Sequence, residues 1–136
     1  MSPRTVLRVD AVLYAGLGLL LLSSTWEALW DALDLPRAEP ELWAQLFGVV
    51  LCAFAYLLWV APRDAMLTRA VAGASAAGNA VAAAVVLVWL LAGDLDVGFL
   101  GTTLLGITAV LLVLFAALEA RIAAYRARVI SLDRRA

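Results

Sequence analysis

Two carboxylic acids stand beside long apolar stretches of the sequence, and they are the residues best suited to chemistry. Asp10 comes directly before the charge-free residues 11–26, and Glu119 comes directly after the charge-free residues 97–118. Tyr14 lies four residues after Asp10, so the two would share one face of a helix. A carboxyl group beside a phenol, held away from water, can bind a proton or act as a general acid.

A buried aspartate needs a partner, and the sequence offers several arginines at a similar position relative to the apolar stretches. We expect Arg69 to lie at the level of Asp10, and Arg8 or Arg121 to lie near Glu119. One interpretation is a structural ring of ion pairs. The other is a polar pocket that binds a head group, a proton or a small substrate.

Ser75 and Asn79 fall inside the third apolar stretch, one helical turn apart. A serine can return its hydrogen bond to a backbone carbonyl one turn back, but an asparagine amide cannot be satisfied so easily. We therefore expect Asn79 either to bond to a neighbouring helix or to face an internal cavity.

The composition excludes several kinds of chemistry. The chain has no histidine, which is the commonest metal ligand and general base, and its single cysteine, Cys52, cannot form a disulfide or a redox pair within the chain. A net charge of −1 argues against a nucleic-acid partner. We expect no metal, no cofactor and no catalytic constellation.

The apolar stretches are long enough to cross a membrane. Of the 136 residues, 65% are hydrophobic and only 15% are charged, whereas a soluble domain is about half apolar and about a quarter charged. The runs are continuously apolar, which favours helices of about 20 residues over membrane strands. The prediction is one all-α transmembrane domain over residues 1–136, with four spans at about 6–24, 42–61, 69–92 and 98–119. The first charge-free run is too short for a span, so helix one must draw Asp10 into the membrane edge.

The charges between the spans predict the orientation. Residues 24–42 hold five acids and one arginine, and the loop at 92–98 holds two acids alone. Arginines gather in residues 1–10, in residues 61–69 and in a basic tail at 120–136. By the positive-inside rule we expect both termini to be cytoplasmic. All ten basic residues are arginine, which together with the many Ala, Leu and Val residues suggests a GC-rich bacterial genome, so we expect a bacterial inner membrane.

A short amphipathic helix is expected at about residues 25–34, lying in the outer interface. Ser24 and Glu27 have the spacing of a capping box. Indole rings favour the interface, and the predicted anchors are Trp26, Trp30, Trp43, Trp59 and Trp89. The helix is either such an anchor or a lid over a cavity.

Small residues recur every four positions in the third span, and this row predicts close packing of helices. Its members are Ala70, Ala74, Gly78 and Ala82. The row is either the packing face of the central helix of a four-helix bundle or the seam of a homodimer.

The sequence resembles the DoxX-like group of small four-helix bacterial membrane proteins. The matching segments are Leu7-Arg8-Val9-Asp10, Gly16-Leu17-Gly18, Leu35-Pro36 and Leu46-Phe47-Gly48. The resemblance implies a four-helix membrane fold and, for some members, a link to quinone-coupled sulfur oxidation or to partner redox enzymes. It transfers no catalytic residue to this chain.

The sequence as a whole favours a non-enzymatic membrane protein that binds a lipid, a quinone or a partner membrane protein, alone or as an accessory subunit. One alternative is a small proton-coupled transporter that works as a dimer. The other is a membrane isomerase or cyclase for a hydrophobic substrate, with Asp10 or Glu119 as its acid.

Overall fold

The computed structural model describes residues 2–36, 39–92 and 97–133, with the backbone alone for residues 126–133. All its regular elements are helices: α1 (Pro3–Leu22), α2 (Glu27–Ala32), α3 (Glu41–Val60), the 3-10 helix η1 (Ala61–Arg63), α4 (Ala65–Ala92) and α5 (Phe99–Asp133). The acids of the second acidic loop, Asp94 and Asp96, and tail residues 134–136 lie outside the described residues.

Four of these helices are long and apolar enough to cross a membrane: Pro3–Leu22, Glu41–Arg63, Ala65–Ala92 and Phe99–Tyr125. They confirm the four predicted helical stretches, and their length and composition are those of a multi-pass membrane protein. Many large apolar side chains face outward along them, as lipid-facing residues do.

The helix ends follow from local chemistry. Ser2 caps α1 by accepting a hydrogen bond from the amide of Thr5, and Pro3 occupies the first turn. Asp64 does the same for α4, where its Oδ1 accepts from the amide of Leu67 at 2.7 Å. Pro62 falls just past the end of α3 and stops it.

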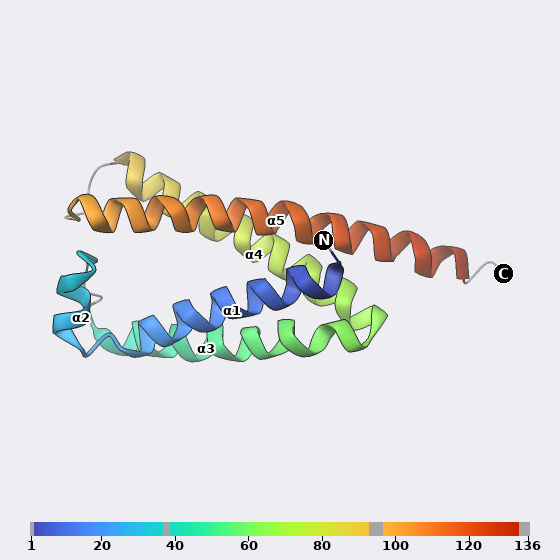
Figure 1. Cartoon of the computed structure of the whole chain (residues 1–136), viewed down its shortest axis with the longest axis horizontal. Helices are drawn as coiled ribbons and strands as arrows, with labels where there is room; N and C mark the ends of the chain where they lie inside the picture. Colours follow the sequence, from blue (N-terminus) through green and yellow to red (C-terminus); the bar gives the residue numbers. More distant parts are fainter. Residues whose placement is uncertain (1, 37–38, 93–96, 134–136) are drawn as a thin grey trace.

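The four long helices form two antiparallel pairs, α1 with α3 and α4 with α5 (Figure 1). The pairs approach each other at the end of the bundle that holds η1, which we call the η1 end. They separate toward the opposite end, where α2 lies and which we call the α2 end. The main buried apolar cluster reaches from the η1 end to the middle of the bundle, and its members are Val6, Leu7, Ala11, Tyr14, Ala55, Leu58, Ala61, Val71, Ala72, Phe115 and Ile122.

Two glycines allow the first pair to pack backbone to backbone. A Cβ atom on Gly18 would lie 2.8 Å from the Gly48 carbonyl oxygen, and one on Gly48 would lie 2.7 Å from the Gly18 carbonyl oxygen. Real side chains do not tolerate such distances, so both positions require glycine. The close seam of the bundle is thus on α1 and α3.

The segment after α2 closes onto the start of α5. Asp34 has a positive φ of 55°, a conformation that aspartate adopts more readily than most residues. Its side chain lies against Gly98 and its carbonyl against Gly101, where a Cβ atom would collide with it. This contact holds α2 across the α2 end of the bundle.

Candidate functional site

Five polar side chains meet at the centre of the bundle, and we call them the polar cluster. They come from three helices: Asp10 and Tyr14 from α1, Ser75 and Asn79 from α4, and Glu119 from α5. Asp10, Ser75, Asn79 and Glu119 are fully buried, and Tyr14 is 9% exposed. The structure thus brings together all the polar pocket candidates other than the two arginines, Arg8 and Arg69.

Asn79 is the centre of the cluster. Its amide Nδ2 donates to Glu119 Oε2 at 3.0 Å and approaches Asp10 Oδ2 and Ser75 Oγ at 3.4 Å. Its carbonyl oxygen accepts from the Tyr14 hydroxyl at 2.9 Å. One asparagine therefore joins α1, α4 and α5. This is the first of the two roles expected for it, a hydrogen bond to a neighbouring helix.

The two acids lie next to each other with no basic partner. Ser75 donates to Asp10 Oδ2 at 2.9 Å, and the Asn79 amide nitrogen lies within 3.4 Å of one oxygen of each acid. The remaining oxygens, Asp10 Oδ1 and Glu119 Oε1, are buried and lack a hydrogen-bond donor. Two carboxyl groups in contact cannot both be ionised at low cost.

The expected ion pair between Asp10 and Arg69 does not form, because Arg69 lies on the exposed side of α4. Arg8 instead places its guanidinium 5.0 Å from the ring centre of Trp59, where it ties α1 to α3. Arg121 is exposed as well. Ser75 and Asn79 take the place that the sequence assigns to arginine, so the ring of ion pairs is absent from the described chain.

A large apolar cavity of about 590 Å³ lies between the two helix pairs on the α2 side of the polar cluster. Tyr14 forms its floor, and Trp30, Leu35 and Pro36 close it at the α2 end. Its walls come from all four long helices: Leu17, Leu20, Leu21, Phe47, Val50, Leu51, Phe54, Ala74, Gly78, Ala82, Val86, Leu105, Thr108 and Leu112.

Polar hydrogens in this cavity are already engaged. The Tyr14 hydroxyl donates to Asn79, the Thr108 hydroxyl donates to the Leu104 carbonyl at 2.8 Å, and the Trp30 indole N–H donates to the Ser23 carbonyl at 3.2 Å. Phe54 packs on the Tyr14 ring with a centroid separation of 5.3 Å and fixes its position. Tyr14 therefore separates the cavity from the two acids, which do not line it.

The small-residue row of α4 is not the packing face of a central helix, and its alternative role as the seam of a homodimer stays a prediction. Ala70, Ala74, Gly78 and Ala82 are all exposed, and the last three line the cavity. The buried face of α4 lies beside that row and consists of Thr68, Val71, Ala72, Ser75, Asn79 and Ala83. These three residues thus form part of the cavity wall, and the cavity stays open beside them because side chains this small do not fill it.

The predicted anchors divide into two groups. Trp26, Trp43, Trp59 and Trp89 are 45–66% exposed, as interfacial indoles should be, but Trp30 is only 6% exposed and covers the cavity. A buried indole N–H needs a hydrogen-bond partner, and Trp30 finds one in the Ser23 carbonyl.

The predicted capping box is wrong, since α2 begins after Trp26 without a side-chain cap and the Ser24 hydroxyl has no hydrogen-bond partner.

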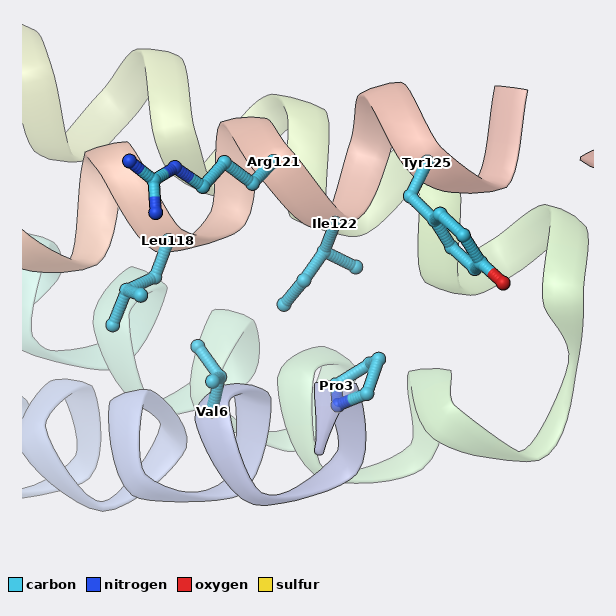
Figure 2. Close-up of a pocket in the computed structure, with 6 residues that line it drawn as sticks. All are labelled: Pro3, Val6, Leu118, Arg121, Ile122 and Tyr125. Atoms are coloured by element: carbon cyan, nitrogen blue, oxygen red, sulfur yellow. The ribbon is translucent and has the colours of Figure 1, made fainter. Parts of the chain in front are cut away.

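A second pocket, of about 330 Å³, lies at the η1 end between α1 and α5 (Figure 2). It is lined by Pro3, Val6, Leu118, Arg121, Ile122 and Tyr125. Figure 2 shows Val6 extending from α1 toward Leu118 and Ile122 of α5. Val6 is one turn before Asp10, and Ile122 is three residues after Glu119, so the pocket's lining lies next to the acids along both helices, although neither acid is part of it.

No group of three or more His, Cys, Asp or Glu side chains is placed to hold a metal ion in the described part of the chain. No family model, no curated protein and no solved structure matches the chain. The resemblance to DoxX-like proteins therefore stays a prediction.

Proposed function

We propose that the chain is a non-enzymatic multi-pass membrane protein that binds the hydrocarbon chain of a lipid or of a lipid-like molecule such as a quinone. The observation that carries this proposal is the apolar cavity of about 590 Å³ between the helix pairs, capped by α2. Its volume lies within the range of about 300–1,000 Å³ that is typical of small-molecule sites.

The chemistry of the cavity walls favours hydrocarbon over a polar head group. The hydrogens of Tyr14, Thr108 and Trp30 already serve protein acceptors, so a ligand with carbonyl groups would find no free donor there. A head group would lie outside the cavity. Exposed wall residues on α3 (Phe47, Val50) and on α4 (Ala74, Gly78) give an opening through which a chain can enter from surrounding lipid.

We place this protein in a bacterial inner membrane with both termini in the cytoplasm, following the arginine-rich termini and middle loop. The η1 end is then cytoplasmic, and the cavity lies in the outer half of the membrane under α2. Function as an accessory subunit is compatible with this arrangement, since a bound lipid or quinone can be shared with a partner enzyme.

The test is native mass spectrometry of the protein released from mild detergent, with Ala82→Leu as the cavity-filling variant. The wild-type protein should retain a bound lipid or quinone, and Ala82→Leu should lose most of it. Ala70→Leu is the matched control, because Ala70 belongs to the same exposed row but does not line the cavity. A wild-type protein without bound lipophile, or equal occupancy in the two variants, would overturn the proposal.

One observation favours a second function, a proton-coupled transporter that works as a dimer. Asp10 and Glu119 form a buried acid pair without a basic partner, which a purely structural bundle does not need. Proton flux into proteoliposomes should then disappear in Asp10→Asn and in Glu119→Gln. The third candidate, an isomerase or cyclase, is less favoured because neither acid lines the cavity in which its substrate would lie.

A further inference from the structure

We propose that Asp10 and Glu119 together bind one exchangeable proton. The proton comes from water and returns to water, and no other bond forms or breaks. This site is distinct from the cavity and does not depend on the lipid-binding function.

The first argument is the balance of charge. Both side chains are fully buried, and a pair of buried negative charges without a cation is far costlier than a single one. One shared proton removes one of the charges. It also supplies a hydrogen-bond donor in a cluster where one oxygen of each carboxyl group has none.

The second argument is the set of charged groups around the pair. Arg8 of α1 lies over Trp59, and Arg69 of α4 and Arg121 of α5 are exposed, so none of them neutralises the acids. The charged groups of the η1 segment, Arg63 and Asp64, are exposed as well. Tyr14 is the other titratable group in the cluster, and its hydroxyl donates to Asn79.

The third argument distinguishes a proton from a metal ion. A hard cation surrounds itself with about six or more oxygen ligands. Here only two oxygens are unpartnered, while Asp10 Oδ2 accepts from Ser75 and Glu119 Oε2 accepts from Asn79. This arrangement suits a proton, which needs one donor oxygen and one acceptor oxygen.

The structure also provides a route for exchange. Val6 and Ile122 line the η1-end pocket (Figure 2), and each lies within one helical turn of one acid, Val6 of Asp10 and Ile122 of Glu119. Both side chains are at least nine-tenths buried. Exchange with water therefore requires them to move, and it should be slow in the wild-type protein.

The experiment is infrared spectroscopy of the wild-type protein in lipid nanodiscs, from neutral to alkaline pH. We expect the carbonyl stretch of one protonated carboxylic acid at neutral pH, which shifts in deuterated buffer and disappears as the pH rises. The double variant Asp10→Asn/Glu119→Gln should lack this band. Because the wild-type titration needs no variant, a variant that fails to fold leaves the test intact.

Sodium titration separates the two possible cations. A band that survives added Na⁺ at constant pH supports a proton, whereas a band that Na⁺ abolishes indicates a metal site and overturns the proposal. A wild-type protein without any protonated carboxyl at neutral pH would also overturn it. Failure to find bound lipid would affect the proposed function and not this site, since neither acid lines the cavity.

Stability gives a second, independent measurement. If the folded chain holds one proton more than the unfolded chain, its stability falls as the pH rises, and the unfolding equilibrium constant grows by up to about tenfold per pH unit. Asp10→Asn/Glu119→Gln should remove this dependence. A wild-type protein whose stability does not change between neutral and alkaline pH would contradict the proposal.

Discussion

The two ends of the bundle are built on opposite principles. From the η1 end to the centre of the bundle the helix pairs touch, and hydrogen bonds in the polar cluster join α1, α4 and α5. At the α2 end the pairs separate around an apolar cavity. Since lipid is as apolar as the cavity walls, only the first region strongly favours one arrangement of the pairs. Changes to the polar cluster should therefore affect stability, and changes to the cavity walls should affect how much lipid the cavity holds.

The largest effect is expected for Asn79→Leu. The substitution leaves the Tyr14 hydroxyl and Glu119 Oε2 without their partner, at about 1–3 kcal/mol each, for a loss of about 2–6 kcal/mol. Unfolding of detergent-solubilised protein by sodium dodecyl sulfate would measure it. A loss no greater than that of Ala82→Leu would remove the contrast between the two ends.

A smaller loss, of about 1–3 kcal/mol, is expected for Gly18→Ala, because the new methyl group meets the backbone of α3 at Gly48 and the sulfur of Cys52. Gly16→Ala is the matched control on the same helix. A Cβ atom at Gly16 meets nothing within 4 Å, so its unfolding free energy should not fall. If both variants were equally stable, the tight seam of the first pair would be refuted.

Trp30→Phe should cost about 1 kcal/mol, since it removes the hydrogen bond to the Ser23 carbonyl but keeps most of the apolar cover. Its clearer effect should be a faster loss of bound lipid, which native mass spectrometry at successive times would measure. Trp26→Phe is the control, because Trp26 is 63% exposed. Equal release from both variants would mean that Trp30 is an interfacial anchor after all.

The smallest effect is expected for Arg8→Ala, which removes the cation–π contact with Trp59 at a cost of about 0.5 kcal/mol. The same unfolding measurement applies. A loss of several kcal/mol would mean that Arg8 neutralises the acid pair, and it would restore the ion-pair interpretation.

The sequence was sufficient for the helices and for the burial of Asp10, because both depend on the length of apolar runs. It was not sufficient for the partners of Asp10, which depend on the rotation of α4 about its own axis. Small residues lie on two adjacent faces of that helix, and apolar periodicity alone does not choose between them. Ser75 and Asn79 could have identified the buried face of α4, since two polar side chains one turn apart in an apolar helix belong on the buried face. The sequence offered a cavity under residues 25–34 only as one alternative, because the position and volume of the cavity depend on the angle between the two helix pairs.

The glycine contact between α1 and α3 has a mechanical consequence. Because their backbones touch at Gly18 and Gly48, we expect these two helices to move together. The α2 end of α4 lies about 20 Å from Asn79 at the rise of a helix. A rotation of about 5° at that asparagine would displace the far end by roughly 2 Å over that length. The capacity of the cavity is therefore governed by an angle, and the side chains that set the angle lie outside the cavity.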